Sequence, residues 1–200
     1  ESERDALYQA VTRQLGSVDV LFNNAGIGWY GYFERMPMPL AAELVEVNVS
    51  AVVHLTGLFL ADMRARGRGH IINMGSLTGV MPVQGSVVYG ASKAFLESFT
   101  TALHRELAGT PVRVSVIRAG AVKTEFFQTV SAREGGQKLP GEGAAVDVER
   151  VVNGLWSLIQ RPRRIAYVPW TMRLMPWAEL LAGWIMDRVG PALLRREKTG

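Results

Sequence analysis

Short apolar runs alternate with longer segments in which apolar residues recur at helical spacing. The short runs, which predict buried strands, are residues 18–22, 70–75, 112–117 and 165–168. The helical pattern covers about residues 2–15, 39–66, 87–108 and 147–160. Strands that alternate with helices favour an α/β fold built on a parallel sheet with right-handed crossovers.

Two segments break this alternation. Residues 125–145 are rich in glycine and contain Pro140, which predicts a mobile loop. Residues 169–200 form an apolar and basic helical tail, and we expect Pro176 to break it in two.

The tail carries three tryptophans seven residues apart, which is two turns of a helix: Trp170, Trp177 and Trp184. Charged residues interrupt its apolar stretches, so no run reaches the length of a membrane-spanning helix. Three interpretations stay open: packing on this chain or a partner subunit, a lid over an apolar substrate, or peripheral contact with an anionic membrane surface.

The overall composition suits one globular domain, because 200 residues with 48% hydrophobic content can bury one sizeable core. The chain has no cysteine and three scattered histidines, so we expect neither disulfides nor a metal site. The basic charge lies in the last 40 residues, with eight Lys/Arg against three Asp/Glu. The first 160 residues carry a net charge of −1, and no nucleic-acid motif is present, so we expect no nucleic-acid partner.

Small or polar residues follow three of the predicted strands. Asn23-Asn24-Ala25-Gly26 closes the first, Ser76 lies just past the second, and Gly120-Ala121-Val122-Lys123-Thr124 follows the third. Open α/β sheets bind ligands at the carboxyl ends of their strands. The sequence therefore predicts a ligand site there.

Tyr89 and Lys93 lie four residues apart on a predicted helix, and therefore on one face of it. An ammonium about 5 Å from the phenol would lower the tyrosine pKa by roughly two units. We expect such a tyrosine to exchange protons near neutral pH, which is the chemistry of carbonyl and alcohol redox reactions. Alone, this spacing is weak evidence, since most such pairs are solvated on a helix surface.

The motifs together resemble the short-chain dehydrogenase/reductase family over roughly residues 5–130. The matching residues are Asn23, Asn24, Ala25, Gly26, Asn48, Ser76, Tyr89, Lys93, Gly120, Val122 and Thr124. The resemblance implies a doubly wound, Rossmann-type parallel sheet and a nicotinamide cofactor, NAD or NADP. It further implies hydride transfer between the nicotinamide and a hydroxyl or carbonyl group of a small-molecule alcohol or ketone. Residues 1–168 would then be the C-terminal part of one NAD(P)-binding domain.

The resemblance also implies residue roles. Tyr89 would exchange the proton with the substrate oxygen, Ser76 would hydrogen-bond that oxygen, and Lys93 would bias Tyr89 and bind the nicotinamide ribose. Asn48 would hold a water molecule of a proton relay. Two structural alternatives stay open: Ser76 as an ordinary helix or turn cap, and Asn48 as a satisfied buried amide.

The remaining motif residues would form the cofactor site. Asn23 to Gly26 would brace the loop beside the cofactor, together with Tyr89 and Lys93. Thr124 and the backbone of Val122 would bind the nicotinamide carboxamide. The family has Pro-Gly where this chain has Ala119-Gly120, which leaves the turn looser.

The family's glycine-rich turn, Thr-Gly-x-x-x-Gly-x-Gly, does not occur in the chain. We therefore expect an N-terminally truncated fragment that lacks about three strands, with little activity on its own. The alternative is a truncated, non-catalytic interaction or dimerisation module. The residues that choose between NAD and NADP would precede residue 1.

The helices at 39–66 and 87–108 are apolar on nearly all sides, which predicts burial on more than one face. By resemblance we expect a homodimer or homotetramer through them; the tail covering this surface within one chain is the alternative. Loops 27–38 and 125–145 would supply apolar substrate walls: Trp29, Tyr30, Tyr32, Phe33, Phe126 and Phe127. The location we expect is the cytoplasm, with membrane association through 170–200 as a variant.

Overall fold

A parallel sheet forms the centre of the molecule, as the alternating pattern predicted. The computed structural model describes residues 2–189. Within them, a four-stranded parallel sheet has the order β1-β2-β3-β4. Its strands are β1 (Val20–Asn23), β2 (Gly69–Ser76), β3 (Val112–Ala119) and β4 (Ile165–Val168). The sequence located all four, with ends that differ by one or two residues.

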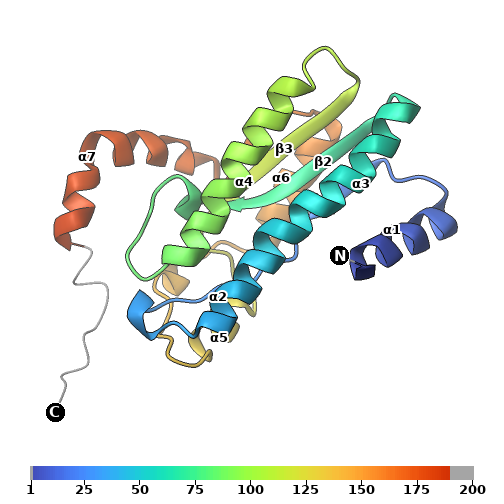
Figure 1. Ribbon diagram of the computed structural model, residues 1–200. Helices are drawn as coiled ribbons and strands as arrows, with labels where there is room; N and C mark the ends of the chain where they lie inside the picture. Colours follow the sequence, from blue (N-terminus) through green and yellow to red (C-terminus); the bar gives the residue numbers. More distant parts are fainter. Residues whose placement is uncertain (1, 190–200) are drawn as a thin grey trace.

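Helices cover both faces of this sheet (Figure 1). Helices α3 (Ala51–Arg66) and α4 (Val87–Glu106) pack on one face, and α6 (Val148–Gln160) packs on the other. Ile71 and Ile72 show the arrangement, because these neighbours on β2 point to opposite faces and neither is exposed. Strands buried on both faces are typical of parallel sheets, and the fold is of the Rossmann type.

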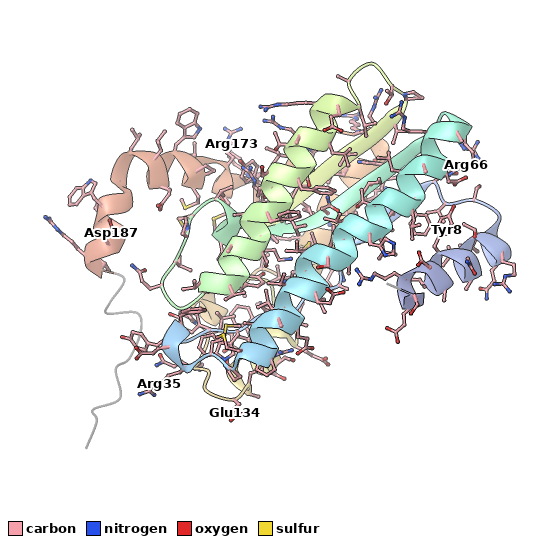
Figure 2. The ribbon with its side chains drawn as sticks, in the orientation of Figure 1. Tyr8, Arg35, Arg66, Glu134, Arg173 and Asp187 are labelled. Carbon is pink, nitrogen blue, oxygen red and sulfur yellow. The ribbon has the colours of Figure 1, made fainter. Side chains whose placement is uncertain are left out.

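Helix α1 (Ser2–Leu15) lies along the outer side of α3 rather than on the sheet (Figure 1). Its Tyr8 points toward α3 (Figure 2) and meets Phe59 edge to face, with ring centroids 5.0 Å apart. This contact extends the core beneath α3 and α4 outward to α1.

The predicted helix at 39–66 is one helical segment with an interruption. Helix α2 (Met38–Val45) passes through a π-helical turn, η2 (Glu46–Ser50), into α3. The π turn contains Asn48, and such turns are often found at functional sites. By length and composition the segment Met38–Arg66 could cross a membrane, but a core helix meets the same criterion. Phe59 and Met63 of this segment lie in the core against the sheet, as expected for a core helix.

The prediction of a loop over residues 125–145 was wrong at its beginning. Helix α5 (Phe126–Ser131) forms there, and a short 3-10 turn, η4 (Glu142–Ala144), follows. Phe127 and Val130, three residues apart, are both buried and give α5 an apolar face. That short pattern was obscured by the glycines that follow it.

The tail begins with the 3-10 turn η5 (Trp170–Leu174) and continues as α7 (Met175–Val189). The expected break at Pro176 was wrong in its position, because Pro176 lies within the first turn of α7, where proline is tolerated, and the helix is interrupted at Ala182 instead. Helix α7 extends away from the sheet (Figure 1), and its apolar side chains are largely exposed: Trp177, Leu180, Leu181 and Trp184. Residues 190–200, which the tail prediction included, lie outside the described residues.

Candidate active site

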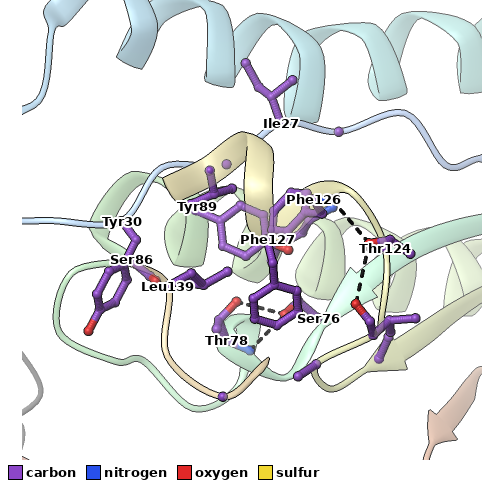
Figure 3. Close-up of a pocket in the computed structure, with 18 of the residues that line it drawn as sticks. Ile27, Tyr30, Ser76, Thr78, Ser86, Tyr89, Thr124, Phe126, Phe127 and Leu139 are labelled. Atoms are coloured by element: carbon purple, nitrogen blue, oxygen red, sulfur yellow. Dashed lines mark hydrogen bonds between the residues drawn. The ribbon is translucent and has the colours of Figure 1, made fainter. Parts of the chain in front are cut away.

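A cavity of about 1010 Å³ lies at the carboxyl ends of the strands (Figure 3). Most of the predicted site residues line it: Asn24, Ala25, Gly26, Ser76, Tyr89, Lys93, Gly120, Val122 and Thr124. Asn23 and Asn48 are instead buried in the surrounding structure. The structure thus brings together side chains that the sequence predicted as one site.

Ser76 is the last residue of β2, and its hydroxyl has two kinds of partner. It interacts with the Tyr89 side chain, which α4 presents to the same cavity, and this interaction acts to lower the pKa of Tyr89. It also accepts hydrogen bonds from the backbone N–H of Thr78 at 3.2 Å and from the Thr78 hydroxyl at 2.9 Å (Figure 3). Ser76 therefore caps the following turn, as the structural alternative expected, and its role in the chemistry stays a prediction.

Lys93 is buried below Tyr89, one helical turn further along α4. Its Nζ lies 5.7 Å from the centroid of the Tyr89 ring and donates a hydrogen bond of 2.8 Å to the Met74 carbonyl. Burial lowers the pKa of Lys93 to about 8. A Cβ atom added to Gly26 would lie 3.5 Å from this Nζ, so glycine leaves the ammonium accessible to the cavity loop.

The predicted direction of the Tyr89 pKa was wrong for this structure. Burial raises the pKa of Tyr89 above its ordinary value, and the hydrogen bond with Ser76 only partly offsets this. The Lys93 ammonium lies under the ring and is bonded to Met74, so it does not stabilise the phenolate oxygen directly. Tyr89 therefore carries its proton at neutral pH in this structure.

Asn48 is fully buried in the π turn, and its side-chain amide is satisfied by protein groups. Its Oδ1 accepts from the Ile27 N–H at 2.9 Å, and its Nδ2 donates to the Ile27 carbonyl at 2.9 Å. The same Nδ2 lies 3.0 Å from the Ser92 hydroxyl. The side chain thus holds the loop after Gly26 against α4, which is the structural alternative for this residue.

A buried series of amides and hydroxyls joins two strands and two helices behind the cavity. Asn23 Nδ2 donates to Asn73 Oδ1 at 2.8 Å, and Asn73 Nδ2 donates to the Thr100 hydroxyl at 2.8 Å. Asn23 also donates to the Thr56 hydroxyl at 3.3 Å. The sequence analysis missed Thr56, Asn73 and Thr100. The signal for Asn73 was a polar residue inside an apolar strand, since a buried amide needs partners.

The turn after β3 forms another side of the cavity. The Gly120 N–H donates to the Val168 carbonyl at 2.9 Å, which joins this turn to β4. The Thr124 hydroxyl is exposed and accepts from the Phe126 N–H at 3.4 Å (Figure 3). It is therefore only weakly engaged with the protein and lies open to the cavity.

The donor set of the cavity fits a nicotinamide nucleoside. The Lys93 ammonium suits ribose hydroxyls, and the Thr124 hydroxyl with the backbone near Val122 suits a carboxamide. Gly26 allows the loop to pass close to Asn48, since a Cβ there would stand only 3.3 Å from Asn48 Oδ1. Among the described residues, no group of three or more His, Cys, Asp or Glu side chains could hold a metal ion.

Apolar side chains form the rest of the cavity wall. Of the aromatic residues expected there, four line the cavity: Trp29, Tyr30, Phe126 and Phe127. Phe33 is half exposed, and neither it nor Tyr32 is a lining residue. The sequence analysis missed the contribution of residues 77–86, which include Leu77, Val83 and Gln84.

Two loops that form this wall are fastened to each other. The Trp29 Nε1–H donates to the Glu134 carbonyl at 3.1 Å, and the Gln137 N–H donates to the Tyr30 carbonyl at 2.7 Å. Arg35 and Glu134 mark the two loops at the same end of the molecule (Figure 2). The cavity is thus closed on this side by two hydrogen bonds between segments about 100 residues apart in sequence.

Comparison with known proteins shows the family of the chain. The profile of the family described as short chain dehydrogenase matches residues 1–135. The chain belongs to this family. It is 38% identical over 151 residues to the ketoacyl reductase HetN of Nostoc sp., covering 76% of this chain and 52% of that protein. It therefore spans about half the length of this relative.

Other relatives are covered more fully. The chain is 30% identical over 192 residues to the NADP-dependent 3-hydroxy acid dehydrogenase YdfG of Salmonella typhi, covering 92% of this chain and 75% of that protein. A short-chain dehydrogenase/reductase from Burkholderia phymatum, solved in complex with NAD, aligns with a TM-score of 0.79 at 22% identity. That alignment covers 92% of this chain and 73% of the solved one. It shows the same fold and confirms the expected family architecture.

Proposed function

We propose that this chain carries the catalytic part of an NAD(P)-dependent oxidoreductase. Its reaction would be hydride transfer between a nicotinamide and a hydroxyl or carbonyl carbon of a predominantly apolar small molecule. The observation that supports this best is that Ser76, Tyr89 and Lys93 line one apolar cavity, with the Lys93 ammonium 5.7 Å from the centroid of the Tyr89 ring.

The residues of this chain would act as follows in carbonyl reduction. The bound nicotinamide supplies the hydride. Tyr89 gives its proton to the substrate oxygen as negative charge develops there, and the Ser76 hydroxyl hydrogen-bonds the same oxygen. The raised pKa of Tyr89 keeps that proton in place until the charge forms. In alcohol oxidation the acceptor would be the Tyr89 phenolate, so Tyr89 must first lose its own proton, while Ser76 would again hydrogen-bond the substrate oxygen.

Lys93, Tyr89, the segment from Asn23 to Gly26, and the turn containing Gly120, Val122 and Thr124 would hold the nicotinamide end of NAD or NADP. Solved relatives support both cofactors, since one is a complex with NAD and another a complex with NADP. The metagenomic oxidoreductase with NADP is 30% identical, with a TM-score of 0.63, and the alignment covers 82% of this chain and 66% of that one. The Asn48 side chain is already hydrogen-bonded to Ile27 and Ser92. It would therefore position the water of the proton relay indirectly, by holding the loop at Ile27 against α4.

The test is a nicotinamide absorbance assay with NAD(H) and NADP(H) against ketones, aldehydes and alcohols of increasing apolar size. It is run on residues 1–200 and, where the reading frame extends before Glu1, on the longer protein as well. Turnover that depends on Tyr89 supports the proposal. Turnover equal in Tyr89→Phe and the unaltered protein would refute it.

We further propose a homodimer or homotetramer through the outer faces of α2, α3 and α4. Apolar side chains stand exposed there: Val45, Val53, Val87 and Phe95. Phe95 and Phe99 stack at 5.7 Å on this side of α4. Light scattering of the unaltered protein and of Phe95→Glu tests this assembly. The same surface would serve the alternative, a non-catalytic dimerisation module, which requires dimers without nicotinamide turnover.

The exposed face of α7 supports peripheral contact with an anionic membrane as an accessory property of residues 170–200. Trp177, Leu180 and Trp184 are more than half exposed, and the Arg188 guanidinium lies 5.2 Å over the Trp184 ring. Aromatic and cationic groups together suit a lipid headgroup layer. Flotation with anionic and neutral liposomes, with and without residues 170–200, tests this. Equal flotation after deletion would end the membrane proposal and leave the tail as a packing element.

A further inference from the structure

A buried charged residue continues the stripe of reactive side chains on α4. Tyr89, Lys93 and Glu97 follow one another at intervals of four, so all three face the sheet. Glu97 Oε2 accepts a hydrogen bond of 2.8 Å from Arg118 Nη2 of β3, and the side chains are only 8% and 11% exposed. The described mechanism uses neither residue.

Arg118 extends this contact across the sheet to β4. Its Nη1 donates to the Tyr167 hydroxyl, and its guanidinium carbon lies 5.1 Å over the Tyr167 ring. The strand register pairs Gly75 with Arg118 and Arg118 with Tyr167. The next row of the register contains Ser76, so the network lies directly beneath the level of the proposed catalytic serine.

Gly75 provides the space through which Glu97 reaches the sheet. A Cβ at Gly75 would lie 3.0 Å from Glu97 Oε1, 2.7 Å from Val116 Cγ2 and 3.1 Å from the Ile117 carbonyl oxygen. Contacts this close leave no room for a side chain. One residue earlier, the Met74 carbonyl accepts the hydrogen bond from Lys93. Helix α4 is therefore bonded to the sheet at two successive turns, by Lys93 and by Glu97.

This arrangement is costly for the fold. Burial raises the pKa of Glu97, and the Arg118 charge opposes that shift. Among the described residues, Glu97 Oε1 and Arg118 Nε have no hydrogen-bond partner. Buried ion pairs add little net stability compared with apolar residues of the same size. The ion pair of Glu97 and Arg118 lies one row below Ser76 in the strand register. A role in positioning the site explains this location better than a role in stability.

We propose that Glu97, Arg118 and Tyr167 are positioning residues, which hold α4 in register with β2 and β3. They thereby keep the Tyr89 side chain beside Ser76 at the cavity. The kinetic test of this inference rests on the proposed oxidoreductase function. The spectroscopic test rests on the fold alone.

The decisive variants are Arg118→Lys, Tyr167→Phe and the double variant Glu97→Leu/Arg118→Met. A lysine keeps the charge but cannot bond Glu97 and Tyr167 in the planar, two-pronged way of a guanidinium. The double variant removes both charges and keeps the apolar volume, so its fold does not suffer from one unpaired buried charge. Ser115→Ala is the matched control, because Ser115 is buried on the same strand as Arg118 and bonds outside the cavity.

We expect kcat to fall about tenfold in Arg118→Lys and in the double variant, with KM changed less than about twofold. Tyr167→Phe should show a smaller fall, and Ser115→Ala none. A double variant with unaltered thermal stability and unaltered kcat would overturn the proposal. So would an Arg118→Lys protein with unaltered kcat.

A second measurement separates this proposal from the proposed function. Ultraviolet titration of each variant, minus that of its Tyr89→Phe counterpart, reports ionisation of Tyr89 without any turnover. Loosening of α4 should admit water and lower the Tyr89 pKa back toward its ordinary value in Arg118→Lys, but leave it unchanged in Ser115→Ala. A titration identical in all variants would overturn the positioning role even in a protein that shows no turnover.

Discussion

The polar side chains at the two ends of the sheet have opposite surroundings. At the amino end, His70 of β2 is bonded through Nε2 to the Ser115 hydroxyl at 2.8 Å, and Ser115 donates to the Arg163 carbonyl at 2.6 Å. At the carboxyl end, Ser76, Tyr89 and Lys93 border a cavity of about 1010 Å³. At the amino end, His70 Nε2 and the Ser115 hydroxyl form a short series of protein hydrogen bonds, while His70 Nδ1 is buried without a partner among the described residues. The carboxyl end presents its polar groups to a ligand-sized space.

The difference shows what a candidate site costs the fold. Burial lowers the pKa of His70 to about 4, so the ring is neutral at pH 7. Burial also lowers the pKa of Lys93, but only to about 8, so this group stays mostly charged at pH 7 inside the protein. A buried charge is destabilising unless it is paired and hydrogen-bonded. The amino end thus keeps its buried histidine neutral, whereas the carboxyl end keeps a buried ammonium, which under the proposed function takes part in the reaction.

The largest effect should come from Tyr89→Phe, which removes the proton donor and keeps the ring. We expect turnover to fall by about 10³-fold or more. Cofactor binding, followed by nicotinamide fluorescence, should be nearly unchanged, because the ring contacts remain. A fall in cofactor affinity of the same size as the fall in turnover would show that Tyr89 binds rather than reacts.

Lys93→Met should lower turnover by about 10²-fold and at the same time stabilise the fold. The folded pKa of Lys93 lies below its unfolded value of 10.5, so the charged form is disfavoured by folding at every pH below that value. Methionine removes this penalty but also the bond to Met74, and we expect a net gain of about 1–3 kcal/mol at pH 7. Urea unfolding checks the gain, and a loss of stability would show that the Met74 bond outweighs burial.

Lowering the pH should reveal how much His70, at the amino end of the sheet, contributes to the stability of the fold. His70 has a folded pKa of about 4 and an ordinary value of 6.5, so the unfolded chain takes up its proton first. The contribution is complete above pH 6.5 and is lost as the pH falls to about 4, by at most about 3 kcal/mol. Urea unfolding of the unaltered protein and of His70→Gln at pH 7 and pH 4.5 measures it. The variant should lose less stability in acid, while an equal loss would assign the effect to carboxylates.

Ser115→Ala should have the smallest effect, confined to stability. It leaves His70 Nε2 and the Arg163 carbonyl without their shared partner, which costs about 1–2 kcal/mol. The kcat and KM values should match those of the unaltered protein. A change in kcat would show that the two ends of the sheet are coupled.

The sequence predicted the strands and long helices because each buries its own periodic apolar face. The sequence also predicted that Ser76, Tyr89 and Lys93 share one site, since parallel strands end at the same edge of a sheet. It could not reveal the π turn at Asn48, because a single extra residue barely disturbs helical spacing.

Features that depend on register and burial were also beyond the sequence. The pairing of Gly75 with Arg118, or of Asn23 with Asn73, is set by how neighbouring strands align. The direction of the Tyr89 pKa was wrong because it depends on enclosure by segments distant in sequence, among them Phe126 at 5.6 Å between ring centroids.

Phe126 occupies the volume that the missing side chain of Gly28 leaves free, since a Cβ there would stand 2.5 Å from the end of its ring. Its other side meets the Tyr89 ring. The size of the residue at position 126 therefore sets how bulky a molecule can approach the phenol, while the reacting groups themselves stay as they are. Under the proposed function, a substitution at position 126 would therefore change the range of substrates without changing the residues proposed for the chemistry.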